Sequence, residues 1–397
     1  MTRARGDMSQ MMMDPFGTLR ALRATGPLVE LAETGGVGVM RYEEVRGLLT
    51  DGRLRANFTD FLRQFGVTSG PFFDWMAMSP LNHDGPHHLR WRALMSRTFT
   101  PRSVERLRPF LGRAAHELID GFASGGACDF MAAFADAYPS LGLCELIGVP
   151  VEDRDRFRGW ANTIGLGFSP LVGLHVAAVD EALTQLLGYT GELAAARRAD
   201  PRDDLVSRLA VAAADDGWSD FEVRGFIAGL VFAGHETTKN KLGWTIAVLA
   251  DHPAVWDAVA RGAVAVADVV EEVLRFRSAV TGVGRTAAEP VQVGDDRLAP
   301  GDRVFLSIWS ADHDERAFPH PEALDPAQSV EVPHVAFGHG AHHCLGAALA
   351  RAELQEGLAA LAARIGCHTI GEGAVWRPPL GITGPETLPI RFAPRAG

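Results

Sequence analysis

The stretch Phe337-Gly338-His339-Gly340-Ala341-His342-His343-Cys344-Leu345-Gly346 is the most informative part of the chain. Two glycines precede Cys344 at alternate positions, where a chain can turn sharply and bring its amides close to a bound group. The segment that follows is rich in alanine and leucine, which favours a helix. Cys344 is therefore expected at a helix N-terminus, where the dipole favours a thiolate. A thiolate in such a loop suits a soft metal centre, and a haem iron is one candidate.

Two other interpretations of this stretch stay open on the residues alone. A free cysteine is usually a small buried hydrophobic side chain. The three histidines at 339, 342 and 343 could instead join Cys344 in a zinc site. Structural zinc sites usually pair their ligands in two separated clusters, however, and the chain has no Cys-x-x-Cys.

The order Phe-Gly-x-Gly-x-His-x-Cys-Leu-Gly, followed by Ala-x-x-Ala-Arg-x-Glu-Leu, resembles the haem-binding loop and next helix of the cytochrome P450 monooxygenases. The resemblance covers nearly the whole chain and implies one large domain over residues 1–397. That domain would be mainly α with a minor β component and small antiparallel sheets. The implied cofactor is haem b (iron protoporphyrin IX), with Cys344 as the proximal iron ligand. The cofactor-binding residues implied in this loop are Phe337, Gly338, Gly340, His342, Cys344 and Gly346.

Composition limits the kind of protein this is. The chain has 397 residues, of which 47% are hydrophobic, and a net charge of −11, which argues against a nucleic-acid partner. No run of about 20 apolar residues suggests a membrane span. The basic start lacks the apolar core of a signal peptide. Four widely spread cysteines indicate a reduced compartment. We therefore expect a cytoplasmic monomer with no membrane or nucleic-acid partner, and a flexible segment over residues 1–13.

A long helix is predicted from about Ser219 to Ala250, with Ser219 and Glu222 forming a capping box. At ~1.5 Å per residue it would span about 48 Å. Its middle, Ala233-Gly234-His235-Glu236-Thr237-Thr238, resembles the family's Ala-Gly-x-Glu/Asp-Thr-Thr motif. The resemblance implies that Glu236 and Thr237 deliver protons to dioxygen, and that Ala233 and Gly234 lie against the flat cofactor. The alternative is an exposed glutamate beside a threonine that bonds the helix backbone.

Cations for the cofactor's propionates are predicted outside the cysteine loop. His88 and Arg92 are four residues apart, so they share one helix face and could bind carboxylates. Alone, such a pair is more often a solvated face. The segment resembles the family's Asp-Pro-Pro-x-His-x-x-x-Arg motif, although Gly85 replaces the first proline. The resemblance implies that His88, Arg92 and Arg285 bind the propionates together with His342.

Glu272 and Arg275 resemble the family's Glu-x-x-Arg pair, which is buried and supports the cysteine loop. On the residues alone, an i, i+3 pair is a weak signal. The family usually adds an arginine from the segment before the loop. None lies between residues 325 and 337, and Gln328 stands nearest the expected place. The usual triad is therefore in doubt.

The substrate site is expected to be apolar. Residues 57–81 are crowded with phenylalanine, tryptophan and methionine, and glycine and proline interrupt them, so one regular helix is not expected. These side chains either form ordinary core or line a pocket. Helices are predicted over Arg102–Phe122, Phe130–Ile147, Asp153–Trp160, Val176–Arg197 and Asp203–Ala213. The substrate-binding residues implied by the family layout are Phe72, Phe73, Leu230, Val280, Val283 and Ile382.

The resemblance implies insertion of one oxygen atom from O2 into a small apolar substrate, with aromatic compounds and natural products among the candidates. No flavin or iron–sulfur pattern is present, so electrons would come from a ferredoxin and ferredoxin reductase. Arginines that could face an acidic ferredoxin are Arg90, Arg97, Arg102, Arg106 and Arg113. Two alternatives are a peroxide-driven peroxygenase and a non-catalytic recruitment module of the same fold. The former tends to lack the acid–alcohol pair, and the latter tends to lose the cysteine or that pair.

Overall fold

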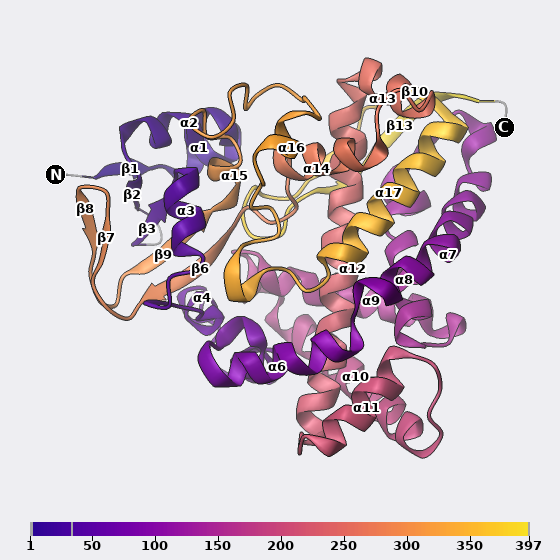
Figure 1. Cartoon of the computed structure of the whole chain (residues 1–397), viewed down its shortest axis with the longest axis horizontal. Helices are drawn as coiled ribbons and strands as arrows, with labels where there is room; N and C mark the ends of the chain where they lie inside the picture. Colours follow the sequence, from indigo (N-terminus) through magenta and orange to yellow (C-terminus); the bar gives the residue numbers. More distant parts are fainter. Residues whose placement is uncertain (1–2, 33–34, 396–397) are drawn as a thin grey trace.

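The computed structural model describes residues 3–32 and 35–395. Helices dominate, and the strands gather mainly towards the end of the molecule where the chain begins (Figure 1). This confirms the predicted mainly α fold with a minor β component. The longer helices are α6 (Gly85–Thr98), α7 (Pro101–Asp120), α8 (Tyr138–Ile147), α9 (Arg154–Gly165), α10 (Val172–Ala199), α11 (Leu205–Asp215), α12 (Asp220–Ala250), α14 (Val266–Phe276) and α17 (Ala347–Arg364).

Shorter helices connect these elements and close the sheet end. They are α1 (Met8–Met13), α2 (Pro15–Thr25), α3 (Tyr42–Leu48), α4 (Phe58–Gln64), α5 (Pro71–Met78), α13 (Pro253–Ala260), α15 (Ile308–Ala311) and α16 (Gln328–Glu331). Single turns are η1 (Pro80–Asn82), η2 (Ala123–Gly125), η3 (Met131–Ala135), η4 (Val151–Asp153), η5 (Leu166–Phe168) and η6 (Gly340–His342). None of the helices among the described residues is both long and apolar enough to span a bilayer.

The largest sheet has the order β1-β2-β3-β9-β6-β4. Two of its pairings, β1 with β2 and β3 with β9, are parallel, so this sheet is mixed. The three smaller sheets are antiparallel, as predicted. The other sheets are β10-β13-β5, β11-β12 and β7-β8. The strands are β1 (Ala4–Gly6), β2 (Leu28–Leu31), β3 (Gly36–Val39), β4 (Leu54–Arg55), β5 (Ala127–Asp129), β6 (Gly282–Ala287), β7 (Val291–Val293), β8 (Asp296–Leu298), β9 (Arg303–Ser307), β10 (Ile365–Ile370), β11 (Val375–Trp376), β12 (Pro385–Thr387) and β13 (Pro389–Pro394).

Helix α12 runs through the middle of the molecule (Figure 1). The predicted capping box is present, because the Ser219 hydroxyl accepts from the Glu222 amide at 3.2 Å and the Glu222 carboxylate accepts from the Ser219 amide at 2.8 Å. Helices α8, α9, α10, α14 and α17 all contact α12. Most residues in the second half of α12 are therefore buried whichever side of the helix they occupy, as expected for a helix inside a large core.

Two regions differ from the sequence expectations. Residues 3–13 have regular structure, where a flexible start was expected: β1 pairs with β2, and Arg3 bonds Asp296 at 2.8 Å. Residues 130–147 do not form one helix, but the π-helical turn η3 followed by α8. Pro139 lies in the first turn of α8, where its missing N–H costs nothing, and it would interrupt a continuous helix.

Candidate active site

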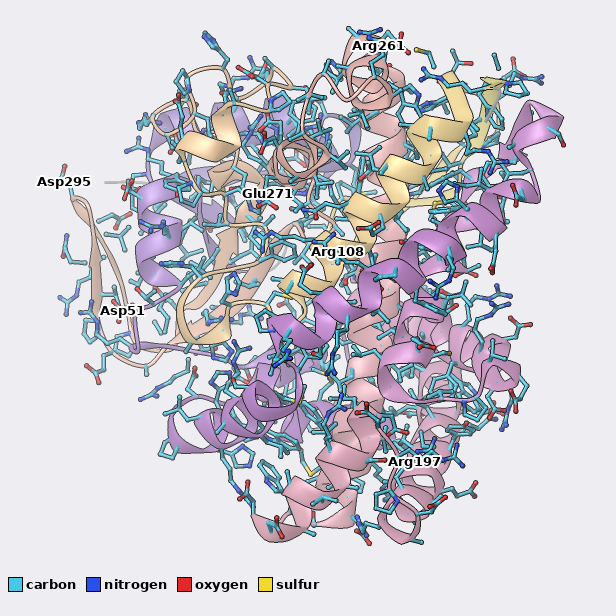
Figure 2. All side chains as sticks on the ribbon, turned by 45° about the vertical axis from the view of Figure 1, so that its right-hand side comes forward. Asp51, Arg108, Arg197, Arg261, Glu271 and Asp295 are labelled. Carbon is cyan, nitrogen blue, oxygen red and sulfur yellow. The ribbon has the colours of Figure 1, made fainter. Side chains whose placement is uncertain are left out.

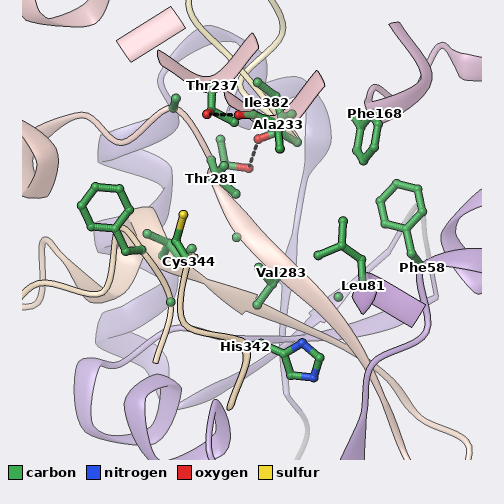
Figure 3. Close-up of a pocket in the computed structure, with 18 of the residues that line it drawn as sticks. Phe58, Leu81, Phe168, Ala233, Thr237, Thr281, Val283, His342, Cys344 and Ile382 are labelled. Carbon is green, nitrogen blue, oxygen red and sulfur yellow. Dashed lines mark hydrogen bonds between the residues drawn. The ribbon is translucent and has the colours of Figure 1, made fainter. Parts of the chain in front are cut away.

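A cavity of about 930 Å³ lies between α12, the cysteine loop, α6 and β6, and apolar side chains make up most of its wall (Figure 3). Most of the residues predicted to bind cofactor or substrate line it. They are His88, Arg92, Leu230, Ala233, Gly234, Thr237, Val280, Val283, Arg285, Phe337, Gly338, His342, Cys344, Gly346 and Ile382. Gly340, Glu236, Phe72 and Phe73 are not among the lining residues.

The cysteine loop turns as predicted. Gly338 and Gly340 have φ values of 69° and 71°, in the left-handed region that favours glycine. The Cys344 amide donates to the Phe337 carbonyl at 2.8 Å, which closes the loop. Gly340 faces away from the cavity, because a Cβ there would lie 2.8 Å from the Thr50 methyl carbon. Gly340 therefore packs the loop against Thr50, and it is not among the residues that line the cavity.

The Cys344 side chain opens into the cavity, as Figure 3 shows, although protein encloses it on the other sides. Burial raises the pKa of the Cys344 thiol, and this outweighs the lowering by the Gly346 amide and the nearby arginines. Burial thus opposes the thiolate that a helix N-terminus would favour. Helix α17 begins only at Ala347, so its dipole acts from further away than expected. Coordination to a metal is what would deprotonate this thiol.

Four cationic or hydrogen-bonding side chains converge at one end of the cavity. The rings of His88 and His342 lie 4.1 Å apart, and His342 Nε2 lies 2.8 Å from an oxygen of Asp84. Among residues 3–32 and 35–395, which the structure describes, no carboxylate lies within ion-pair distance of Arg92 or Arg285. Burial lowers the pKa of Arg285, and lowers that of His88 to about 4. Two arginines that line a cavity without a counter-ion fit a ligand that carries carboxylates.

The middle of α12 presents two faces. Ala233 and Thr237 face the cavity, and the Thr237 hydroxyl donates to the Ala233 carbonyl at 2.6 Å (Figure 3). A hydrogen bond from the threonine to the helix backbone was the alternative considered in the sequence analysis. Thr237 makes this bond and lines the cavity as well. Gly234 also lines the cavity, but a Cβ there would lie 2.7 Å from a Leu143 methyl carbon. The lack of a side chain at Gly234 therefore also allows α12 to pack closely against α8.

Glu236 points away from the cavity and is fully buried. Its carboxylate pairs with Lys239 at 2.8 Å and with Arg377, and the Asn240 amide donates to it at 3.1 Å. Burial alone would raise the pKa of Glu236, but the charges of Lys239 and Arg377 lower it below its ordinary value. The alternative from the sequence analysis, that Glu236 is exposed to solvent, is therefore wrong.

The polar chain continues beyond Glu236 towards the surface. Lys239 Nζ donates to the Asn162 side-chain oxygen at 2.6 Å, and the Asn162 amide donates to Asp136 at 3.0 Å. Arg158 then pairs with Asp136 at 3.2 Å and is 30% exposed. A continuous set of polar side chains thus joins the exterior to the carboxylate beside Thr237.

An aromatic wall bounds the rest of the cavity, though not with the residues predicted. Phe58 and Phe168 have ring centroids 5.0 Å apart, and Phe168 stacks on Phe232 at 4.4 Å. All three line the cavity. Phe72 is fully buried behind this wall, edge-on to Phe168, and Phe73 instead lies under the Arg63 guanidinium. The prediction that Phe72 and Phe73 face the cavity is therefore wrong.

The Glu272–Arg275 pair is fully buried, with two bonds at 2.7 and 2.8 Å. Arg275 also donates to the carbonyls of Asp312, Pro321 and Ala323. Gln328 does not take the place of a third arginine at Glu272. Its amide donates to the His320 and Ala323 carbonyls. Arg275 thus joins α14 to the segment that leads into the cysteine loop, and Gln328 folds that segment on itself.

We expect Arg275→Met to lower the free energy of unfolding by about 3–5 kcal/mol, because it leaves Glu272 buried without its cation. Urea unfolding followed by circular dichroism would measure this loss. The matched control is Arg198→Met. Arg198 pairs with Asp220 on the surface, where exposed fractions of 38% and 82% predict a loss of about 0.5 kcal/mol or less. Equal stability of the two variants would contradict the prediction.

Arg351 of α17 connects the cysteine loop to α14. It bonds Glu271 at 2.6 and 2.8 Å, and its guanidinium lies 4.6 Å from the centre of the Phe337 ring. His334 Nε2 lies 3.2 Å from the same carboxylate, which is labelled in Figure 2. Burial alone would raise the pKa of Glu271, but the bonds from Arg351 and His334 lower it to about 2.

A lowered folded-state pKa predicts a stability contribution that is present at neutral pH and is lost under acidic conditions. For Glu271 the loss should run from its ordinary pKa of 4.5 down to about 2. Glu271→Gln should therefore lower the unfolding free energy by roughly 2–3 kcal/mol at neutral pH, and by progressively less as the pH falls through that window. Urea unfolding at several pH values would show this. The exposed Glu117→Gln serves as control, and a pH-independent difference would contradict the assignment.

Several residues of the site had no usable signal in the sequence. Arg377 reaches Glu236 from 141 residues away, and nothing near it resembles a motif. Phe58 and Phe168 belong to stretches where core and pocket positions look alike. Asp84 and Lys239 could have been found, because Asp84 begins the motif that contains His88, and Lys239 directly follows the quoted stretch that ends at Thr238.

Comparisons with known proteins agree with this geometry. The family model described as Cytochrome P450 matches residues 265–375. The chain is 35% identical to the luteothin monooxygenase of Streptomyces thioluteus, over 89% of this chain and 87% of that protein. It is 33% identical to the mycinamicin IV hydroxylase/epoxidase of Micromonospora griseorubida, over 95% and 97% of the two chains. Among solved structures, cytochrome P450 CYP109Q5 from Chondromyces apiculatus matches with a TM-score of 0.89 and 30% identity, over 99% of this chain and 100% of that one.

Proposed function

The chain belongs to the cytochrome P450 family, and from that premise we propose that it inserts one oxygen atom from dioxygen into a small apolar substrate, with electrons from a separate ferredoxin system. Monooxygenase activity and a haem-iron cofactor come with the family and with the names of the relatives. The proposal adds haem b as the form of the cofactor, the roles of individual residues, the class of substrate and the electron donor.

One observation carries the proposal: a cysteine thiol, two histidines, and two arginines without a carboxylate at ion-pair distance among the described residues line one apolar cavity. Haem b carries an iron and two propionates. Cys344 would bind the iron, and His88, Arg92, Arg285 and His342 would bind the propionates. The volume of about 930 Å³ lies near the upper end of the range for ligand sites, which suits a porphyrin with a small substrate. When bound, haem supplies the metal chemistry that activates dioxygen.

The side chains on α12 supply proton control. Thr237 offers a hydroxyl at the cavity wall, where it would hold an oxygen atom by hydrogen bonding. Glu236, one residue before it, lies at the inner end of the polar chain that starts at Arg158. Glu236 would accept a proton that originates in solvent water and pass it towards Thr237, as general acids do.

A ferredoxin is the proposed electron donor, and three arginines of α7 support it. Arg102, Arg106 and Arg113 are exposed and would attract an acidic partner. Arg90 does not belong to this group, because its guanidinium lies 3.8 Å above the Trp218 ring and donates to the Asp216 carbonyl at 2.8 Å. The side chain of Arg97 lies outside the described residues.

The proposed substrate is an apolar natural product. The aromatic wall, with Leu230, Val280, Val283 and Ile382 beside it, offers mostly apolar contacts. Relatives are named for luteothin, for mycinamicin IV and for polyketide biosynthesis, which supports a substrate from secondary metabolism.

The purified protein tests this proposal. We expect a Soret band that shifts to the red after reduction and addition of carbon monoxide, and oxidation of an apolar substrate with NADPH, ferredoxin and ferredoxin reductase. Little oxidation should occur with peroxide alone. Oxidation only with peroxide would show a peroxygenase instead, and a protein without a Soret band would show a non-catalytic module.

A further inference from the structure

One face of the largest sheet is rich in glycine. Successive residues of a strand point to opposite faces, so Gly36 and Gly38 of β3 share one face. Gly282 and Gly284 of β6 share one face in the same way. Gly38 and Gly284 both lie opposite Phe305 of β9, and residues opposite each other point to the same side of a sheet. All four glycines therefore lie on the face that carries Phe305.

The cavity that contains Cys344 continues over this face. Every strand from β6 to β1 contributes at least one residue of the face to the cavity wall. These residues are Gly282 and Gly284 in β6, Phe305 in β9, Gly36 in β3, Leu31 in β2 and Gly6 in β1. Leu31 lies opposite both Gly6 and Gly36, so these three also share one face. At ~4.8 Å between neighbouring strands, the distance from β6 to β1 is about 19 Å. We call this part of the cavity the sheet arm.

The glycines of β6 leave room for a ligand at the start of the sheet arm. A Cβ on Gly282 would lie 2.4 Å from Cζ of Phe305, so only glycine lets this ring lie along the sheet. A Cβ on Gly284 would meet no heavy atom of the described residues within 4 Å, its chain neighbours apart. The space beside the Phe305 ring is therefore open.

A row of phenylalanine rings joins the aromatic wall to the sheet arm. The Phe61 ring lies 5.2 Å from that of Phe58 and 4.8 Å from that of Phe65, measured between centroids. All three side chains line the cavity and belong to α4 or its end. The Thr286 hydroxyl of β6 donates to Asp60 of α4 at 3.1 Å, which fixes the row beside the strand where the arm begins.

Helix α1 forms the far wall of the sheet arm. It begins two residues after β1, and its Met8 and Met11 both line the cavity. Their spacing of three residues places them on one face of the helix. Met12 and Met13 lie on the solvent side, with exposed fractions of 48% and 87%. Methionine is flexible and polarisable, so it adapts to apolar groups of different shape.

The charged side chains beside the sheet arm have partners within the protein. Asp7 accepts from the Ser9 amide at 2.7 Å. Asp60 pairs with Arg63 at 3.0 Å. Arg303, on the same face of β9 as Phe305, also interacts within the protein. The contacts that remain for a ligand are therefore mainly apolar.

We propose that the sheet arm binds the apolar tail of an elongated substrate whose other end is oxidised beside Thr237. The chemical class is a molecule with an extended chain of alkyl, alkenyl or aromatic groups. The inference rests on the proposed function, and it changes the expected substrate from a small molecule to a long one. Affinity should then depend on the length of the tail.

Alkylimidazoles of increasing chain length measure the sheet arm in the holoenzyme. The imidazole nitrogen binds the haem iron, and the Soret band reports binding. The probes 1-propyl-, 1-hexyl-, 1-nonyl- and 1-dodecylimidazole differ only in their tails. Each methylene group that leaves water for an apolar site should tighten binding about three- to fourfold. For the native chain we expect the Kd to fall steadily up to the dodecyl probe.

Two variants should shorten the sheet arm at different places. Gly284→Leu places a side chain in the open space at the start of the arm, and Met11→Asp places a carboxylate in its far wall. Both should bind the propyl probe like the native chain. Gly284→Leu should bind the nonyl and dodecyl probes about tenfold or more weakly, whereas Met11→Asp should lose affinity mainly for the dodecyl probe.

The matched control is Met13→Asp, which adds the same charge to the solvent side of α1 and should bind all four probes like the native chain. Native affinity of both arm variants for the dodecyl probe would overturn the inference. Equal losses in Met11→Asp and Met13→Asp would overturn it too, because the long probes would then bind elsewhere.

The shortest probe separates this inference from the proposed function. If the propyl probe leaves the Soret band of the native protein unchanged, the haem site itself is contradicted, and the inference fails with it. If the propyl probe binds but the Kd does not depend on chain length, the proposed function stands and the sheet arm is disproved.

Discussion

Replacing Cys344 with alanine is expected to abolish substrate oxidation and the red-shifted Soret band of the reduced carbon monoxide complex. Cys344 is the one cysteine whose side chain opens into the cavity among the described residues. Loss of residues that merely orient a metal ligand typically costs about 10–100-fold in affinity or activity, so loss of the ligand itself should exceed that range. Absorption spectra of the reduced protein with carbon monoxide would show the change, and product analysis would show the loss of turnover.

The control is Cys367→Ala. Cys367 is also exposed, but it lies on β10, where its thiol donates to the Pro253 carbonyl at 3.7 Å, and it does not line the cavity. This variant should keep the native spectrum and native turnover. A red-shifted Soret band retained in Cys344→Ala would disprove the assignment of the iron ligand, whatever the activity.

The conformation of the cysteine loop could be predicted because the residues that determine it lie within the loop itself. A turn with positive φ at Gly338 and Gly340 requires glycine within the motif itself. Helix α12 was predicted for the same reason, since its capping box lies within four residues of sequence. Local chemistry of this kind is visible in one sequence, and it located the site, because most of the residues that it predicted there line the cavity.

The charge state of Cys344 could not be predicted from that local chemistry. The helix dipole is a property of nearby residues, but burial depends on the whole cavity wall, which distant segments build. Burial prevails and raises the pKa of the thiol. The same limit hid the polar surroundings of Glu236, because Arg377 reaches Glu236, and Asn162 reaches Lys239, only through the tertiary fold.

The aromatic residues show a second limit. Phe72 and Phe58 occupy the same kind of sequence, rich in phenylalanine and broken by glycine and proline. In the structure Phe58 lines the cavity, whereas Phe72 lies 5.7 Å from Phe168 and supports it from behind. Which ring faces the cavity depends on the angle at which α4 and α5 dock. Composition alone does not determine that angle, so the apolar character of the pocket was predictable, but which phenylalanines line it was not.

Replacing Glu236 with glutamine should reduce productive turnover by about 100- to 10,000-fold, the usual range for loss of a general acid. Glutamine keeps the size of the side chain and can still accept a hydrogen bond from Lys239, but it cannot carry a proton to the cavity. Thr237→Ala should also lower product formation, because the hydroxyl that bonds the Ala233 carbonyl at the cavity wall is lost. Product formed per NADPH consumed is the measurement that shows both effects. Electrons should still enter the enzyme, so NADPH should be consumed and peroxide released in place of product.

The matched control for this prediction is Glu192→Gln, an exposed glutamate of α10, which should leave the yield of product per NADPH unchanged. The substitution removes two ion pairs from a buried site, so stability must be separated from chemistry. Leaving Lys239 and Arg377 without their carboxylate should cost a few kcal/mol. Measuring the yield at a temperature well below the unfolding midpoint of each variant removes this effect. A Glu236→Gln enzyme that is folded, takes up electrons and forms product at the native yield would show that protons reach the cavity by another route.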